Sequence, residues 1–360
     1  MVRAAVVLAT GDTKAQIRDV EVLGPDAGEV KVRVRATGVC HSDIHAMDGT
    51  LPQPAPCVLG HEGAGDVIEV GPGVTSVAPG DRVIVSWVPP CGDCKQCLGG
   101  QPHLCLTLTI TAMGNPRFRL DGEPCFGLAG TGTFSEELVL PYQAVVRIPD
   151  DVPYEIGALI GCAVMTGVGS SINVADIRAG SSVAVIGCGG VGIGVIQGAR
   201  VAAAAEIVAI DTVPRKLEWA REFGATHAVT PDEVEALKGE LTGGEGFDYV
   251  LEVVGSSATI RQAYDLTRRG GTTVVVGVGK MTDAVEFNAF ELFFMDKTLK
   301  GSVYGGADVR RDFDRVLRLW RAGHLDLERM ISSRIGLDDV NDAFDAMRAG
   351  EVIRQVILFD

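Results

Sequence analysis

The chain has 360 residues, of which 46% are hydrophobic and 6% aromatic, and 46 are glycine. This length exceeds a typical single core, so we expect two domains with a cleft between them, in a glycine-punctuated α/β protein. With 32 Lys and Arg against 47 Asp and Glu, the net charge of -15 repels phosphate backbones and anionic membranes, which excludes nucleic acid and membranes as expected partners. No apolar run suggests a membrane span or secretion signal, so a cytoplasmic location is predicted.

The first third of the chain is predicted to be mainly β-structure. Residues 29–36 alternate valines with charged residues, as in a strand with one buried face. Gly and Pro mark turns at 71–73 and 79–80.

From about Ser181 the pattern changes to buried strand, Gly-rich turn and helix. Strands are predicted at 183–186, 207–210, 249–254 and 272–278, and helices at 191–205, 214–223 and 258–267. Strands that alternate with helices in this way form a parallel sheet.

After this region, helices are predicted at 310–322 and 340–348 and a strand at 352–359, so the tail is expected to return to the first domain. The predicted fold class is therefore α/β. A Rossmann-type doubly wound sheet over 164–303 interrupts a mainly β domain formed by 1–163 and 304–360.

A glycine-rich loop follows the first strand of the parallel region and opens a helix. Its residues are Gly187, Cys188, Gly189, Gly190, Val191 and Gly192. Such glycines permit a tight turn and close approach to a pyrophosphate at a helix N-terminus. Asp211, 19 residues after Gly192, is placed to accept hydrogen bonds from the adenosine ribose, which favours NAD over NADP. The basic Arg215 and Lys216 nearby leave NADP as an alternative.

Four of the nine cysteines fall within fifteen positions, as Cys91, Cys94, Cys97 and Cys105. This crowding is poor spacing for a disulfide framework but suits one tetrahedral zinc ion. Four protein ligands leave no open position, so the site is predicted to be structural; an iron–sulfur cluster is the rival interpretation.

A second group of potential ligands is dispersed. Cys40-His41-Ser42-Asp43, Gly60-His61-Glu62 and Gly161-Cys162 are individually weak signals, because a single Cys or His is more often a core residue than a ligand.

Together with GHEGAG, the cysteine cluster and the C-terminal Ile-Arg pair, they make the chain resemble the zinc-containing medium-chain alcohol dehydrogenases over essentially its whole length. The resemblance implies a GroES-like first domain and two zinc ions per chain. It also implies that Cys40, His61 and Cys162 hold a catalytic zinc with an open fourth position.

The same resemblance implies roles for further residues. Ser42 contacts the alcohol oxygen and begins a proton relay to His45, while Glu62 and Asp43 orient or tune the metal site. Cofactor contacts are expected from the glycine loop and from His41, Thr166, Asp211, Lys216, Val278 and Arg354. His41 stands where the family often has arginine, which predicts looser NAD binding.

The family's alcohol-pocket positions correspond here to apolar residues: Leu51, Trp87, Leu128, Val278 and Val303. They favour a hydrophobic or aromatic alcohol. The branch that acts on the glutathione adduct of formaldehyde has an acidic residue and an arginine where this chain has Leu51 and Thr109, which argues against that substrate.

Two further hypotheses remain at this point: an alcohol oxidoreductase that keeps and recycles a tightly bound NAD, and a zinc- and NADH-binding protein without catalysis. By family analogy we expect a homodimer or homotetramer.

Overall fold

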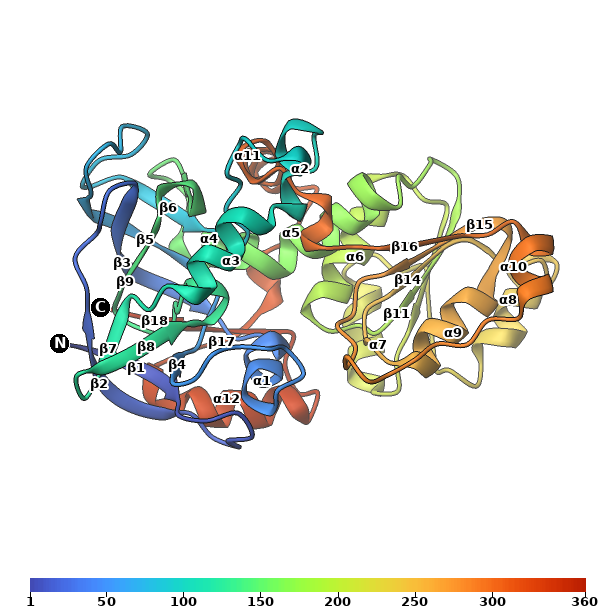
Figure 1. The fold of residues 1–360 in the computed structure, drawn as a ribbon. Coiled ribbons are helices and arrows are strands. Elements are labelled where there is room, and N and C mark those ends of the chain that lie inside the picture. Colours follow the sequence, from blue (N-terminus) through green and yellow to red (C-terminus); the bar gives the residue numbers. More distant parts are fainter. The chain divides into compact units, whose positions relative to one another are not determined.

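The computed structural model describes all 360 residues (Figure 1), and the chain divides into two compact units. The first contains Met1–Ala163, Asp308–Trp320 and Leu327–Asp360; the second contains Val164–Ala307 and Arg321–Asp326. Residues 304–307 and 321–326 thus group with the second unit, although the sequence interpretation placed them in the first domain. For 321–326 the reason is local: the Asp326 N–H donates to Gln197 Oε1 (2.6 Å) and Arg200 donates to the His324 carbonyl (2.8 Å).

The first unit is built on two β-structures. A closed barrel contains β1 (Val2–Val7), β2 (Gln16–Val22), β7 (Phe118–Leu120), β8 (Glu123–Gly127) and β4 (Cys57–Val58). A seven-stranded sheet contains β10 (Val145–Arg147), β6 (Arg82–Val85), β5 (Glu62–Val70), β3 (Glu29–Gly38), β18 (Arg354–Leu358) and β17 (Ile331–Ile335), with β9 (Glu137–Pro141) paired to β3.

Strand β3 shows why this sequence forms a sheet. Val30, Val32 and Val34 are buried on one face, while the charged residues between them keep contact with solvent. The C-terminal β18 pairs antiparallel with β3, so the end of the chain completes the sheet begun near its start. The predicted return of the tail is therefore confirmed.

Helices and short turns cover these sheets. The α-helices are α1 (His41–Asp48), α2 (Lys95–Leu98), α3 (Leu106–Gly114), α4 (Tyr154–Leu159), α11 (Val309–Arg321) and α12 (Val340–Arg348). The 3₁₀ turns are η1 (Pro102–Leu104), η2 (Leu128–Gly130), η3 (Tyr142–Ala144), η7 (Glu328–Met330) and η8 (Leu337–Asp339).

The second unit is a six-stranded, wholly parallel sheet with interleaved helices. Its strand order is β13 (His227–Val229), β12 (Glu206–Ile210), β11 (Ser182–Ile186), β14 (Phe247–Glu252), β15 (Thr267–Val275) and β16 (Thr298–Gly301). Its helices are α5 (Met165–Gly169), α6 (Gly190–Val201), α7 (Pro214–Glu222), α8 (Val234–Thr242), α9 (Ser257–Leu266) and α10 (Ala289–Met295), with the turn η6 (Tyr304–Gly306). The chain winds both ways from β11, which confirms the predicted doubly wound fold and places the topological switch point at β11 and β14.

At two elements the predicted boundaries differ from the structure by three residues or more. The helix expected over 191–205 ends at Val201, because Ala203 adopts a left-handed conformation (φ 59°). The strand expected over 272–278 starts at Thr267 and ends at Val275, so Val278 lies in the following loop.

A continuous helical run over Tyr154–Val174 links the two units. It joins α4 and α5 through π-helical turns η4 (Ile160–Val164) and η5 (Ser170–Val174). By length and composition it could cross a membrane, a feature that the sequence interpretation did not include, but 89% of its most apolar window is buried inside the protein. A single run buried in this way is weak evidence for a membrane span.

Candidate active site

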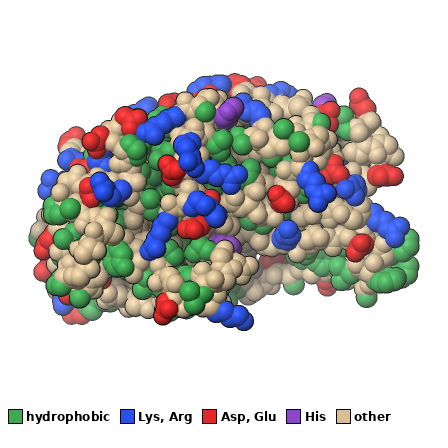
Figure 2. Space-filling view, turned by 90° about the horizontal axis from the view of Figure 1, so that it is seen from above, with side chains coloured by type: hydrophobic (Ala, Val, Ile, Leu, Met, Phe, Trp, Pro, Cys, Tyr) green, Lys and Arg blue, Asp and Glu red, His purple; other side chains and the backbone are tan.

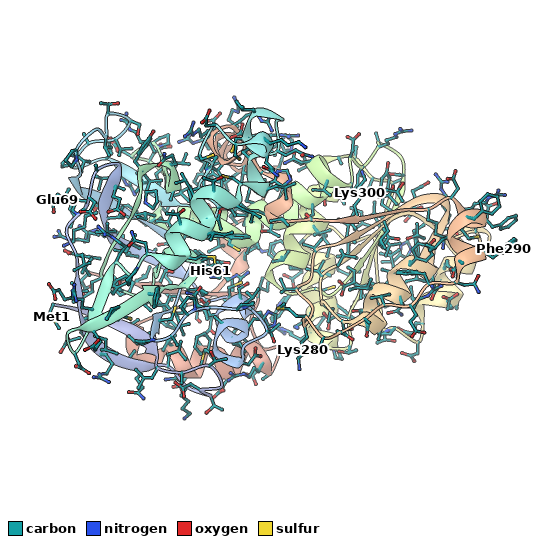
Figure 3. All side chains as sticks on the ribbon, viewed as in Figure 1. Met1, His61, Glu69, Lys280, Phe290 and Lys300 are labelled. Carbon is teal, nitrogen blue, oxygen red and sulfur yellow. The ribbon has the colours of Figure 1, made fainter.

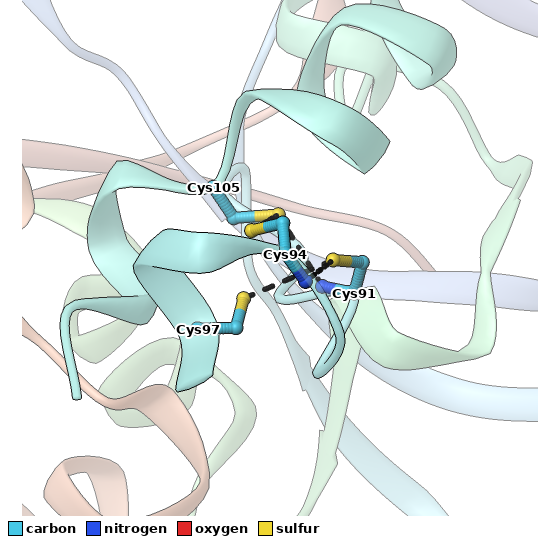
Figure 4. Close-up of side chains that lie close together, drawn as sticks. All are labelled: Cys91, Cys94, Cys97 and Cys105. Atoms are coloured by element: carbon cyan, nitrogen blue, oxygen red, sulfur yellow. Dashed lines mark hydrogen bonds between the residues drawn. The ribbon is translucent and has the colours of Figure 1, made fainter. Parts of the chain in front are cut away.

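The four clustered cysteines meet in a small lobe of the first unit (Figure 4). Cys91 Sγ lies 3.9 Å from Cys97 Sγ, and Cys94 Sγ lies 3.9 Å from Cys105 Sγ. Zinc–sulfur bonds of about 2.3 Å in a tetrahedron require sulfurs roughly 3.8 Å apart. Two sulfur pairs therefore stand at the spacing of a closed zinc site, and all four sulfurs lie within 4.8 Å of one another.

Backbone groups support negative charge in this lobe. The N–H groups of Asp93 (3.5 Å) and Cys94 (3.3 Å) point at Cys91 Sγ, and they lower the pKa of Cys91 to about 6. A thiolate is the form that binds a metal. This chemistry matches the predicted structural site.

A second set of ligands assembles from three separate segments of the first unit. Cys40 precedes α1, His61 precedes β5, whose first residue is Glu62, and Cys162 lies in the π-helical turn η4. Their potential ligand atoms all lie within 4.8 Å of one another, and all four residues are buried (Figure 3 labels His61). The structure thus brings Cys40, His61 and Cys162 together as the resemblance implied.

The polar atoms of this set fit a metal ion. Both ring nitrogens of His61 are buried without a hydrogen-bond partner, although such groups are ordinarily paired. The Cys162 side chain lowers the pKa of Cys40, against the effect of burial, while Cys40 raises the pKa of Cys162. A buried thiol whose pKa is lowered by its neighbour is suited to bind a cation as the thiolate.

Asp43 supports this set from the first turn of α1 and is fully buried. Its Oδ1 lies 3.4 Å from His61 Nδ1 and accepts from the Gly60 N–H (3.0 Å), while Oδ2 accepts from the Cys40 N–H (2.9 Å). At 3.4 Å the contact with His61 is electrostatic. The charge of Asp43 raises the pKa of His61 well above its usual value, although burial alone lowers it.

Glu62 and Arg354 form a buried pair beside the same set. Arg354 Nη2 lies 3.5 Å from Glu62 Oε1, and Arg354 Nη1 donates to the Val39 carbonyl (2.7 Å). Burial raises the pKa of Glu62 to about 8, although the charge of Arg354 acts in the opposite direction. A carboxyl group so close to two thiols and an imidazole adjusts the net charge of the set.

Helix α1 carries the predicted relay residues. Ser42 Oγ lies 3.7 Å from Cys40 Sγ, and His45 follows three residues later, on the same side of the helix. His45 Nδ1 is buried without a hydrogen-bond partner. His41 is exposed at the start of α1, with its ring 6.4 Å from that of His45.

The predicted cofactor loop lies in the second unit, between β11 and α6. Gly187 has φ 95°, which favours glycine, and a Cβ on Gly192 would stand 1.9 Å from the Gly187 carbonyl oxygen. Gly189 precedes α6, and Gly190 and Val191 begin it. Gly187 and Gly192 are therefore required by the turn and by close helix packing, while a Cβ on Gly189 would meet nothing within 4 Å, which leaves the helix N-terminus accessible to an anion.

Asp211 follows β12 and is tied to this loop. Its Oδ2 accepts from the Cys188 N–H (2.8 Å) and its Oδ1 from the Val213 N–H (3.0 Å). Lys216 lies in α7, one turn after the Asp211 loop. Thr166 in α5 has a buried hydroxyl without a partner, which is available to a ligand.

The predicted pocket residues are divided between the units. Leu51 and Trp87 are half-buried and Leu128 is 4% exposed in the first unit, while Val278 and Val303 are 39% and 45% exposed in the second.

Two supporting residues were missed by sequence reasoning. Glu252 ends β14 beside the glycine loop, and Gln53 lies in the segment between α1 and β4. The only signal for Glu252 was a carboxylate at the end of an apolar strand, and Gln53 in a proline-rich segment offered none.

Known proteins match this chain along its length. Residues 26–150 match the alcohol dehydrogenase GroES-like domain, and residues 190–321 match the zinc-binding dehydrogenase family. The NDMA-dependent alcohol dehydrogenase of Amycolatopsis methanolica is 40% identical over 98% of both chains, and the S-(hydroxymethyl)glutathione dehydrogenase of Paracoccus denitrificans is 38% identical over 99% of both. The crystal structure of benzyl alcohol dehydrogenase from Acinetobacter calcoaceticus has 29% identity and a TM-score of 0.92, covering 100% of this chain and 99% of that one.

The fold and the two metal-binding clusters define a zinc-dependent, NAD-linked oxidoreductase. The chain belongs to the zinc-containing medium-chain alcohol dehydrogenase family. It is thus an enzyme, and the alternative of a binding protein without catalysis is wrong.

Proposed function

We propose that this enzyme oxidises a hydrophobic or aromatic alcohol to the aldehyde or ketone, with NAD as the hydride acceptor. The observation that carries the proposal is the buried set of Cys40, His61 and Cys162, in which neither ring nitrogen of His61 has a hydrogen-bond partner. Apolar Leu51 and Trp87, and the 29% identity with a benzyl alcohol dehydrogenase, support an apolar substrate.

In this proposal Cys40, His61 and Cys162 hold the catalytic zinc, and Cys91, Cys94, Cys97 and Cys105 hold the structural one. Bound zinc supplies Lewis acidity to the substrate oxygen, and bound NAD accepts the hydride.

The protein's own residues manage the proton and the charge. Ser42 Oγ accepts the alcohol proton while its own hydroxyl proton leaves toward His45, whose Nδ1 has no hydrogen-bond partner, and His45 releases a proton to solvent. Asp43 holds the His61 ring, and Glu62 with Arg354 adjusts the charge of the site. The proposed cofactor-binding residues are the Gly187–Gly192 loop, Asp211, Lys216, Thr166, His41, Val278 and Arg354.

The test measures NAD-linked rates over short aliphatic, long aliphatic, terpenoid and benzylic alcohols, with zinc content determined on the same samples. We expect two zinc ions per chain, one lost in Cys94→Ala and the other in Cys162→Ser, with activity abolished only in the second. A single zinc ion that disappears in Cys94→Ala would contradict the catalytic assignment.

A second candidate is an enzyme that retains its NAD and recycles it with another carbonyl compound. The 40% identity with an NDMA-dependent alcohol dehydrogenase favours this candidate. Dependence on an added compound is expected if that compound reoxidises NADH while the cofactor stays bound to the enzyme. Nicotinamide released on denaturing the purified protein, at about one per chain, would establish this candidate.

The similarity to the S-(hydroxymethyl)glutathione dehydrogenase of Paracoccus denitrificans suggests a different substrate, the glutathione adduct of formaldehyde. Leu51 and Thr109 provide no charge for such a substrate. Adding S-hydroxymethylglutathione to the alcohol panel decides the question: a rate above that of benzyl alcohol would overturn our choice.

We further propose a cytoplasmic homodimer or homotetramer that assembles through the second unit. Strand β16 is an exposed sheet edge, and beside it in sequence α10 exposes Phe290 (68%) and Phe293 (79%). Figure 3 labels Phe290, and Figure 2 shows hydrophobic side chains gathered at the right-hand edge of the molecule. Light scattering after size exclusion should show Phe293→Lys dissociated and Leu98→Lys unchanged. Cell fractionation tests the location.

A further inference from the structure

The turn η2 of the first unit is fixed at an unusual backbone conformation next to the metal-binding set. Ala129 has φ 53° and Gly130 φ 74°, in the left-handed region that an alanine rarely adopts. A turn of this kind persists only where its surroundings hold it, so its partners matter.

One side of this turn is anchored to the metal site. The carbonyl of Gly60, directly before His61, accepts from the Gly132 N–H (3.1 Å), the Thr133 N–H (2.9 Å) and the Thr131 hydroxyl (3.0 Å). A shift of the turn would therefore strain the segment that presents His61.

The other side is held by Gln53. Its Oε1 accepts from the Ala129 N–H (3.1 Å), and its Nε2 donates to the Gly127 carbonyl (3.4 Å). The side-chain amide thus pairs with the turn as a neighbouring strand would, and the partners themselves fix which amide atom faces which group. Gln53 is flanked by Pro52 and Pro54, which restrict the backbone that carries it.

The two hydrogen bonds of Gln53, here called the Gln53 clamp, connect the segments that carry the apolar side chains of Leu51 and Leu128. Leu51 is two residues from Gln53, and its N–H donates to the His45 carbonyl (2.9 Å), so its position depends on α1. Leu128 lies between the two backbone groups that Gln53 binds. Gln53 therefore joins the segment after the relay helix to the turn beside the metal ligands.

We propose that Gln53 is a positioning residue that sets which alcohols the enzyme accepts, by holding the Leu128 turn against the Leu51 segment. The inference rests on the proposed function. Without the two hydrogen bonds of Gln53, the apolar side chains of Leu51 and Leu128 can shift. The shift weakens the binding of an alcohol large enough to touch them and leaves a small alcohol unaffected.

The direct test of the clamp is amide hydrogen exchange on peptides covering 126–133. Gln53→Met keeps the length of the side chain but makes neither bond, so we expect exchange in this peptide to accelerate about fivefold or more. Gln53→Glu retains an acceptor for Ala129 and should protect that amide nearly as well as the native residue. Gln101→Met, at an exposed glutamine, is the matched control. Unchanged exchange in Gln53→Met would overturn the clamp.

The functional test compares benzyl alcohol with ethanol at saturating NAD. In Gln53→Met we expect the KM for benzyl alcohol to rise about fivefold or more, with the kcat and KM for ethanol within about twofold of the native values. An equal loss for both alcohols would show a general structural role and overturn the inference. If the native enzyme oxidises no alcohol in the panel, the proposed function fails, while the exchange experiment still decides whether the clamp exists.

Discussion

Asp43 is a fully buried carboxylate whose two oxygens reach different parts of the metal-binding set, one toward His61 and Gly60 and the other toward Cys40. Asp43→Asn keeps the shape but removes the charge. We expect zinc affinity at the catalytic site to fall about 10- to 100-fold, as for other groups that orient metal ligands. Competition with a chelator measures the affinity, and Asp150→Asn, at an exposed site, is the control. Equal affinities in the native protein and Asp43→Asn would contradict this role.

Glu252 is the other residue whose burial demands an explanation. Its Oε1 accepts from the N–H groups of Val254 (2.8 Å) and Gly255 (2.7 Å) and from Thr259 Oγ1 (2.8 Å), while Oε2 has no partner. The segment that it fixes packs on the cofactor loop, since a Cβ on Gly187 would stand 2.8 Å from the Val254 side chain.

We therefore expect Glu252→Ala to weaken NADH binding about tenfold, because each buried donor left unpaired costs about 1–3 kcal/mol. Glu252→Gln keeps an acceptor at Oε1 and should bind NADH nearly normally. Fluorescence titration with NADH measures this affinity, and displacement of NADH by AMP gives the affinity for AMP as a comparison. If Glu252→Ala binds NADH as tightly as the native protein, the segment needs no support from Glu252.

At the scale of single residues, the cysteine cluster could be predicted from spacing alone, because its ligands are close in sequence. The set of Cys40, His61 and Cys162 could not. Only the resemblance selected these residues, since ligands from three distant segments leave no local pattern.

At the scale of elements, Arg117 connects three segments of the first unit. Its guanidinium contacts Asp26 (2.9 Å), the Gly24 carbonyl (2.8 Å) and Glu29 at the start of β3. The Arg117 and Glu29 side chains are each only 11% exposed.

Arg117→Met should lower the free energy of unfolding by about 3 kcal/mol, because Glu29 is left as a buried, unpaired charge. The double variant Arg117→Met, Glu29→Met should recover much of this loss. Urea unfolding measures the free energy of unfolding of each variant. If the double variant loses more than the sum of the two single losses, the explanation is contradicted.

Elements with a clear hydrophobic period were predicted well. Strands β11 and β12 and helices α9 and α12 lie where the sequence pattern predicted them, because each strand is a continuous apolar run buried on both faces and each helix buries one face. Helix α3 was missed: its alternating Leu, Thr and Ile residues resemble a strand, and only Ala112 is buried. Its helical form depends on contacts with η2, where a Cβ on Gly130 would stand 2.6 Å from that of Ala112.

At the scale of the whole molecule, acid stability depends partly on Asp248 in the second unit. Burial alone would raise its pKa, but hydrogen bonds from the Ser182 N–H (2.8 Å) and the Arg268 guanidinium (2.7 Å) outweigh burial and lower it. A pKa lower in the folded state than the unfolded value of about 3.9 adds stability above that pH, which is lost as the pH falls through the folded-state pKa.

Asp248→Asn should therefore be less stable than the native protein at pH 7, and the difference should shrink below about pH 4. Thermal unfolding at a series of pH values measures the two proteins. A difference that stays constant down to pH 3 would exclude the charge of Asp248 as its cause.

The sequence by itself determined the class of fold, the glycine loop and the closed cysteine cluster, because periodicity, turn residues and short ligand spacing are local properties. Only the tertiary structure decided that β18 completes the sheet of β3, that His61 lies within 4.8 Å of the Cys40 and Cys162 thiols with no hydrogen-bond partner of its own, and that Gln53 holds the Leu128 turn. Each of these depends on residues far apart in the chain meeting at distances of a few ångströms, which no local pattern specifies.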